Sequence, residues 1–406
     1  MVSTKVSPAL AILICLLFWA IGDQLGSCLS WGHDTWQLTE ALVNYAGGFV
    51  RRGLTGWLIG LAADSTGIQA NHIVVFAGFI FYLLLTVWLL RYSTRIFPPA
   101  LILSCIVMGF PAYQDSIIRK DCMGILLLLG CLLIDRSRLQ RPLAILIVNF
   151  LAGVAILSHE TFGFYAFPAL VFFMGRDRKS MTGCVLVRRC VTMLPAGLCF
   201  LLTAIYHGSP AVAKAVNDSW MPLWRIIDPR NPHLDAPAAA IRALGFTSEQ
   251  GLSSGVALLT SGFYQPTAWA VLFVITFVLV ILFTDRNPDR SSVLAMESKI
   301  RVAAILLAQF VLISPLFLLG NDYGRWLFFW VASSLVLHTL NCRVPRWLES
   351  LVARIFEKAK AGHIFGRLPV KDWYLLFFGV PVCWNVHELL AASPVSRHLQ
   401  IIWSWF

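Results

Sequence analysis

The sequence predicts an all-α integral membrane protein that crosses the bilayer many times. Hydrophobic residues make up 58% of the 406 residues, and charged residues only 13%, about half the charged fraction of a soluble domain. Apolar runs of roughly 17–22 residues recur along the chain, and each is long enough to cross a bilayer as a helix. We therefore expect a single transmembrane domain over residues 1–406, with no separate soluble domain.

The apolar runs predict about eleven transmembrane helices. The first run lacks a small-residue cleavage site and is followed by further runs, so we expect it to stay in the protein as a helix. The ten cysteines show no Cys-x-x-Cys or Cys/His ligand spacing, so the sequence predicts no zinc site and no disulfide framework. The predicted spans are residues 7–22, 73–90, 98–112, 122–134, 142–157, 161–175, 190–206, 267–284, 302–319, 326–341 and 373–390.

The basic residues predict the orientation of these spans. With the N-terminus inside, about two thirds of the 32 Lys and Arg fall in inner segments, so the positive-inside rule favours an N-in, C-out topology. The net charge of +11 then reflects contact with anionic lipid, and we expect no nucleic-acid partner. The compact loops favour a bacterial inner membrane.

Three segments outside the spans are long enough to have structure of their own. The outer loop 23–72 contains amphipathic helix-like runs, and the outer loop 207–266, rich in Pro and Trp, predicts short helices at headgroup level. The inner segment 342–372 alternates apolar and basic residues, which is typical of an interfacial amphipathic helix.

Four polar clusters fall on the predicted outer face, and each combines an acid with a base or a histidine. Charge beside a lipid-facing helix is costly, so it usually marks a water-filled or protein-lined working site. Four such turns on one face predict a common polar cavity. The clusters are the first outer loop with His33, Asp34, Glu40, Arg51 and Arg52; Asp115 with Arg119, Lys120 and Asp121; His159 with Glu160; and Asp322, Tyr323 and Arg325.

The first outer loop contains the strongest candidates for catalysis and for phosphate binding. Asp34 opens a helix-like run, so it is a candidate catalytic base or metal contact, or alternatively the N-cap of that helix. Arg51 and Arg52 precede a second short helix, where guanidinium groups and helix N–H groups both suit a phosphate. The two arginines could instead pair with Asp34, Glu40 or lipid headgroups and hold the loop.

The remaining candidates are substrate contacts in two tight turns. His159 and Glu160 form either a buried acid/base pair or a polar cap on a helical hairpin. Asp322 and Arg325 are three residues apart, so they can pair on one helix face or contact a ligand together with Tyr323. Glu40 is included among the substrate-binding candidates.

The run from His33 to Leu42, followed by Gly47-Gly48 and Arg51-Arg52-Gly53, resembles the first outer loop of the polytopic GT-C glycosyltransferases. Those enzymes take sugar from a polyprenyl-phosphate donor on the non-cytoplasmic face. The resemblance implies that Asp34 is the general base or metal contact and that the arginines meet the donor phosphate. Many members carry a second acid where this chain has Thr35, which weakens the case for a metal-bridging pair.

These residues also fit inverting sugar transfer on chemical grounds. One carboxylate can take the acceptor proton, and cations can stabilise the departing phosphate. The expected partners are therefore the lipid bilayer and a polyprenyl-phosphate-linked sugar or glycan, in cell-surface polysaccharide assembly. A polymerase of undecaprenyl-linked glycans fits the same residues, and the sequence is also compatible with a transporter or flippase, another membrane transferase or a scaffold. No ligand motif supports a metal, and metal dependence stays open.

Overall fold

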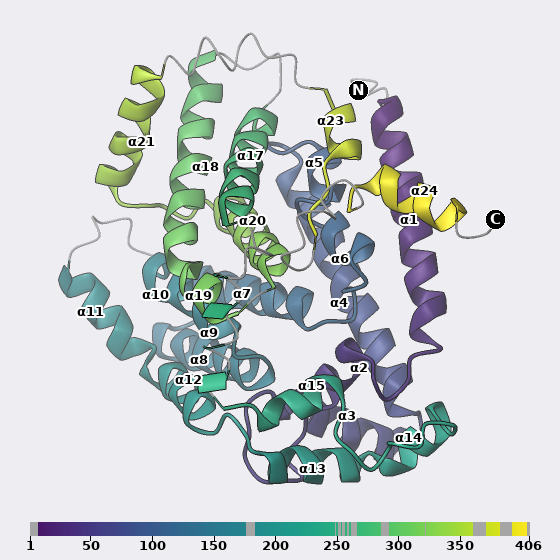
Figure 1. The fold of residues 1–406 in the computed structure, drawn as a ribbon. Helices are drawn as coiled ribbons and strands as arrows, with labels where there is room; N and C mark the ends of the chain where they lie inside the picture. The colour runs from purple at the N-terminus through teal and green to yellow at the C-terminus, as the bar shows by residue number, and fades with distance from the viewer. Residues whose placement is uncertain are drawn as a thin grey trace.

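Within the part of the chain that the structure describes, every regular element is a helix (Figure 1). The computed structural model describes residues 7–175, 183–247, 249, 250, 253, 256, 257, 260, 266–285, 292–320, 322–359, 371–381 and 392–403. The predicted all-α class is therefore confirmed for these residues.

Four helical stretches are long and apolar enough to cross a membrane, and they fit a membrane protein. A fifth results if the pair α11 (Gly183–Thr192) and α12 (Leu194–Ile205), bent by 67° at its break, counts as one span. The four are α1 (Pro8–Cys28), α4 (Ala70–Ser93), α8 (Arg141–Ser158), and α18 (Ser292–Ile313) with α19 (Pro315–Leu319), of which Val293–Leu319 passes as one stretch.

The described helices do not reproduce the predicted number of eleven full-length spans. The predicted spans 98–112 and 161–175 are each divided into two short helices, and the predicted span 373–390 begins with α23 (Trp373–Phe377) and continues into residues outside the described ranges. The helices in place of the shorter predicted spans are α5 (Pro99–Leu103), α6 (Gly109–Tyr113), α7 (Asp121–Arg136), α9 (Phe162–Tyr165), α10 (Phe167–Phe173), α17 (Pro266–Phe283) and α20 (Tyr323–Thr339).

Burial by protein explains why these segments are apolar without being long lipid-facing helices. Every residue from Ala100 to Tyr113 is buried, and so is every residue of α20 from Tyr323 to His338. A broken helix is tolerated at membrane depth where neighbouring protein satisfies its backbone. The Ser104 hydroxyl, for example, bonds to the Leu101 carbonyl at the break after α5.

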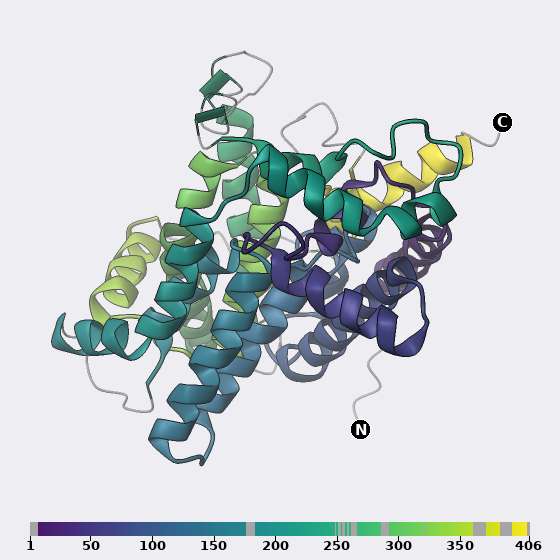
Figure 2. The same cartoon turned by 90° about the horizontal axis from the view of Figure 1, so that it is seen from below.

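The polypeptide connections gather at two opposite ends of the helical bundle. The first-loop helices α2 (Trp36–Leu42) and α3 (Gly53–Thr66) pack at the lower end of Figure 1 with α13 (Pro210–Ser219), α14 (Met221–Ile227) and α15 (Ala239–Arg242). Figure 2 shows the same group from below, with α13 to α15 lying across the first loop. The indole N–H of Trp220 donates to the Leu42 carbonyl at 2.7 Å, so the second loop is fixed onto the first.

The opposite end brings together segments that the sequence predicted to lie on the inner side. Hydrogen bonds there join Ser7 to Asp372, Ser93 to Thr339, Arg136 to Cys342 and Asp285 to Ile96. The predicted amphipathic segment forms α21 (Arg346–Lys358), whose Trp347 and Ile355 are exposed; residues 360–370 of that segment lie outside the described ranges. A last helix, α24 (Pro394–Trp403), lies against α1.

Candidate functional site

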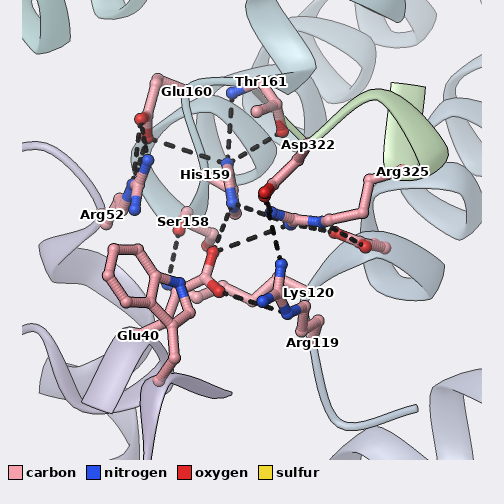
Figure 3. A network of polar contacts seen from close by, with 12 residues as sticks. Glu40, Arg52, Arg119, Lys120, Ser158, His159, Glu160, Thr161, Asp322 and Arg325 are labelled. Carbon is pink, nitrogen blue, oxygen red and sulfur yellow. Dashed lines mark hydrogen bonds and ion pairs between the residues drawn. The ribbon is translucent and has the colours of Figure 1, made fainter. Parts of the chain in front are cut away.

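A buried network of ionisable side chains lies where the first loop meets the helical bundle (Figure 3). Its members come from segments far apart in sequence: α2, the residues before α3, the turn before α7, the C-terminal end of α8 and the N-terminal end of α20. We call this set the buried ion cluster, and it consists of Glu40, Arg51, Arg52, Arg119, Lys120, Asp121, His159, Glu160, Asp322 and Arg325.

Local backbone features place the cluster residues. Helix α8 ends at Ser158, and His159 leaves it with extended backbone angles, which directs the next side chains away from the helix axis. Arg52 precedes α3 with a φ of 68°, in the left-handed region that non-glycine residues rarely adopt. A Cβ on Gly56 would meet the Val43 carbonyl oxygen at 2.2 Å, so only glycine lets α3 approach α2 this closely.

His159 and Glu40 form the central acid–base pair. The His159 Nδ1 accepts the backbone N–H of Thr161 at 3.2 Å, so the proton of the neutral ring lies on Nε2. That Nε2–H donates to Glu40 Oε1 at 2.6 Å. His159 therefore orients the Glu40 carboxylate and leaves its second oxygen, Oε2, without a hydrogen-bond partner among the described residues.

Arg325 connects α20 to Asp121, the first residue of α7. Its Nε and one terminal nitrogen donate to the two oxygens of Asp121 at 2.9 and 2.6 Å, and its other terminal nitrogen donates to Asp322 at 2.6 Å. Asp322 also accepts from Arg119 at 3.3 Å. Forked guanidinium–carboxylate pairs of this kind are strong and directional. The predicted pairing of Asp322 with Arg325 is therefore present.

The two adjacent arginines of the first loop have different environments. Arg52 uses its guanidinium as a fork on Glu160, with Nε 2.7 Å from Oε2. This is a structural pairing, but its partner is neither Asp34 nor Glu40, the acids that the sequence suggested. Arg51 lies farther from Glu160, at 3.8 Å, and is 27% exposed. The Nε of Arg51 has no hydrogen-bond partner among the described residues, so Arg51 is the arginine available to a ligand.

The buried ion cluster contains one more cation than carboxylates. Five side chains carry positive charge and four carry negative charge, with His159 neutral. Arg119 Nε lies 4.0 Å from Glu40 Oε2, beyond hydrogen-bond distance, and neither atom has a hydrogen-bond partner among the described residues. Buried polar atoms are normally paired, so these unpaired atoms and the excess positive charge fit an anionic ligand with a hydroxyl nearby.

Burial and ion pairing together determine the protonation states. Burial alone would raise the pKa of Glu40, but Arg325, the His159 hydrogen bond and Arg119 outweigh it and hold the pKa well below its usual range. The pKa of Glu160 is lowered in the same way by Arg52, against the effect of burial. Burial lowers the pKa of His159, and it lowers the pKa of Lys120 to about 8. Glu40 and Glu160 are therefore ionised, and His159 is neutral near pH 7.

The structure brings most of the predicted site residues together but leaves two outside. Glu40, Arg51, Arg52, His159, Glu160, Asp322 and Arg325 belong to the buried ion cluster. The Asp34 side chain is 79% exposed and lies 3.6 Å from His33 Nδ1. The N-cap of α2 is Thr35, so the N-cap interpretation of Asp34 was wrong. Tyr323 stacks on Phe317 and donates its hydroxyl to the Phe317 carbonyl, away from the ion pairs.

Three members of the cluster, Arg119, Lys120 and Asp121, were noted in the sequence as a polar turn but not proposed as site residues. The Lys120 ammonium donates to the Ser158 carbonyl at 2.8 Å and fixes the end of α8. The available signal was that acid and base are adjacent in a turn on the same predicted face. Asp115, from the same turn, instead pairs with Arg397 of α24 at 2.7 Å.

Neither a metal site nor a relative helps to identify the chemistry. Among the described residues, no group of three or more His, Cys, Asp or Glu side chains is arranged to hold a metal ion. No family model matches the chain, and neither a curated protein nor a solved structure shows significant similarity to it. The function must therefore be inferred from the buried ion cluster and its surroundings.

Proposed function

We propose that this protein is a membrane glycosyltransferase that moves a sugar or glycan from a polyprenyl-phosphate-linked donor to an acceptor hydroxyl. The reaction takes place on the non-cytoplasmic face, in the assembly of a cell-surface polysaccharide. One observation carries the proposal. The Glu40 carboxylate has one oxygen without a hydrogen-bond partner among the described residues, and it lies beside cations that outnumber the acids, at the junction of a loop layer with apolar helices.

The geometry suggests a role for each group in an inverting transfer. The acceptor hydroxyl attacks the anomeric carbon and gives its proton to Glu40 Oε2, while the bond from that carbon to the phosphate oxygen breaks. The electron pair leaves with the phosphate, whose growing negative charge Arg51 and Arg119 stabilise. His159 holds Glu40 in place through its Nε2–H.

The low pKa of Glu40 is compatible with its role as a base. Arg119 is one of the cations that lower it and is also one that the donor phosphate would contact, and a nearby anion raises the pKa of a carboxylate. Donor binding is therefore expected to make Glu40 a stronger base at the moment when the acceptor arrives. Before the donor binds, the low pKa of Glu40 keeps its carboxylate from taking up a proton.

Release of polyprenyl phosphate tests this proposal. The protein in proteoliposomes is incubated with a panel of polyprenyl-phosphate sugars, and acceptor-dependent release of the free lipid phosphate is measured by mass spectrometry. Glu40→Gln should still bind the donor lipid but release almost none of its sugar. Unchanged release by a well-folded Glu40→Gln protein would overturn the role of Glu40, and donor binding without release by the wild type would favour a transporter.

The proposal includes the N-in orientation, which places the buried ion cluster near the outer surface. The excess of Lys and Arg in the segments at the opposite end supports this orientation. Alkaline phosphatase fused after Gln69 should be active, and the same enzyme fused after Ser93 should be inactive. The reverse pattern would place the cluster on the cytoplasmic side and exclude a donor on the outer face.

A further inference from the structure

Helix α21 carries exposed apolar and exposed basic side chains, and the proposed reaction uses none of them. It has 13 residues, five of them charged, and it packs beside α18 at the edge of the molecule (Figure 1). Thirteen residues correspond to ~20 Å of helix, which is too short for the ~30 Å hydrocarbon core of a bilayer. The exposed apolar side chains of α21 are therefore not those of a membrane span.

The structure divides the apolar residues of α21 into two stripes. Val352 is 1% exposed, and Leu348 and Phe356 beside it pack against the core of the bundle. This buried stripe holds α21 to the protein. The second stripe precedes it by one residue in each turn and stays outside the core; its members are Trp347, Leu351 and Ile355, which are 65%, 39% and 50% exposed.

Exposed cations lie next to the second stripe, on the side away from the buried one. At 100° per residue, Arg354 and Lys358 project within about 60° of the middle of the exposed stripe, whereas Glu349 projects on the opposite side. Arg346, Arg354 and Lys358 are exposed, and none of them has an ion-pair partner among the described residues. One side of α21 therefore presents an uncovered apolar stripe together with unpaired positive charge.

This combination matches the surface of a membrane that contains anionic phospholipids. An interfacial helix buries its apolar side chains at the acyl boundary, and long basic side chains reach from there to the lipid phosphates. The indole ring of Trp347 suits the headgroup level. Acyl chains cover the exposed stripe and phosphates supply the counter-charge that Arg354 and Lys358 lack, so a single partner satisfies both features.

We propose that this side of α21 binds anionic phospholipids at the inner membrane surface. Trp347, Leu351 and Ile355 enter the acyl boundary, and Arg354 and Lys358 contact lipid phosphates. The sequence predicts this segment on the inner side, where anionic lipids give the cytoplasmic leaflet a negative surface potential. The inference goes beyond the proposed function, because it concerns a surface that takes no part in sugar transfer.

A photocrosslinker placed on each side of α21 tests what covers that side. A benzophenone amino acid replaces Leu351 or, as the matched control, Glu349, in the full-length protein in nanodiscs of equal parts phosphatidylglycerol and phosphatidylcholine. Position 351 should form phospholipid adducts, identified by mass spectrometry, and position 349 should form at least tenfold fewer. Phosphatidylglycerol adducts should outnumber phosphatidylcholine adducts by about fivefold or more, since two cations lie beside the stripe. Added salt should reduce this preference.

Charge variants test whether the lipid preference comes from α21. Arg354→Gln combined with Lys358→Gln should keep the adducts at position 351 but remove most of the preference for phosphatidylglycerol. Arg225→Gln combined with Arg230→Gln is the matched control, because it removes the same charge from two exposed arginines of the second loop. The control should keep the preference of the wild type.

Crosslinks from position 351 to a second copy of the chain would make this side of α21 a protein contact and overturn the inference. Equal lipid adducts at positions 351 and 349, or none at 351 in a protein that unfolds at the wild-type temperature, would also overturn it. A similar yield of the two lipids, or the same preference in both pairs of charge variants, would reject anionic lipid as the partner. None of these results depends on release of polyprenyl phosphate, so this inference and the proposed function can fail separately.

Discussion

Two acidic residues of the first loop, Asp34 and Glu40, have opposite environments although only six positions separate them. Asp34 is 79% exposed, and its neighbour is His33. Glu40 is buried among His159, Arg119 and Arg325, all of which come from distant parts of the chain. The comparison shows that an acid beside a membrane span becomes a candidate site only when the fold surrounds it with partners.

The physical difference between the two acids is desolvation. The exposed Asp34 carboxylate keeps most of its hydration, and contacts of exposed charges contribute only about 0–1 kcal/mol to stability. A buried carboxylate is tolerated only with ion pairs and hydrogen bonds that offset the lost hydration, and the removal of one partner is costly. The Glu40 environment is therefore the one in which small changes in structure have large effects on chemistry.

The largest expected effect separates the two acids by activity. Glu40→Gln keeps the shape of the side chain but removes the proton acceptor, so sugar transfer should fall by roughly 10²–10⁴-fold. Asp34→Asn should retain activity within a few-fold of wild type, because its carboxylate lies in solvent. The measurement is the rate of sugar transfer by each variant in membranes, at matched expression.

The opposite order would contradict the comparison. If Asp34→Asn loses transfer while Glu40→Gln retains it, the base is the residue that the resemblance implied, and the buried ion cluster has a structural role.

The second prediction extends the comparison to the adjacent arginines. Arg52→Lys replaces the fork on Glu160 with a single point of contact, which should lower the free energy of unfolding by about 1–3 kcal/mol. Arg51→Lys should leave stability unchanged but weaken donor binding, because lysine cannot donate two parallel hydrogen bonds to a phosphate. Thermal unfolding in detergent and binding of polyprenyl phosphate measure the two effects.

Each arginine variant is the control for the other. Loss of donor binding in Arg52→Lys with normal stability, together with wild-type binding in Arg51→Lys, would reverse the assigned roles.

The third prediction concerns pH. His159 has a pKa below its ordinary 6.5, so between these two values the unfolded chain binds more protons than the folded protein. Stability should therefore fall as pH decreases below about 6.5. His159→Gln removes the titrating group and should flatten this part of the profile. Unfolding temperatures between pH 7.5 and pH 5 test this, above the range where Glu40 and Glu160 take up protons.

A profile in His159→Gln with the same slope as wild type would assign the acid sensitivity to other groups. Lys120, with its pKa lowered to about 8 by burial, has the same sign in a separate window. Stability should rise between about pH 8 and 10.5, and Lys120→Met should remove that rise.

The smallest expected effect tests how the second loop supports the buried acid. Trp220→Phe removes the N–H that bonds to the Leu42 carbonyl, two residues after Glu40. This should lower the free energy of unfolding by about 1 kcal/mol. Transfer should fall by less than tenfold, since the apolar ring remains. Trp31→Phe, another indole-to-phenyl change near the same loops, is the control. A larger loss in the control would show that the Leu42 contact has no special role.

The polar turns show how far sequence reasoning can reach at the site. Grouping the turns by predicted side placed Glu40, His159, Glu160 and Arg325 on one face, and the structure brings them into contact. The sequence could not decide whether Asp34 or Glu40 is the candidate base, because both are acidic residues in the same loop. Which of them is buried depends on how the tertiary structure brings His159 and Arg325 against α2.

The sequence by itself determined the membrane class, the helical fold and the polar character of the turns that form the site, because these follow from hydropathy and from the positions of charges. It did not determine the number of full-length spans, since residues 98–112 and α20 contain long apolar runs but are buried by protein. Only the tertiary structure decided which arginine pairs with Glu160 and which stays available. Pairing and burial depend on contacts between segments more than one hundred residues apart, and no local pattern records them.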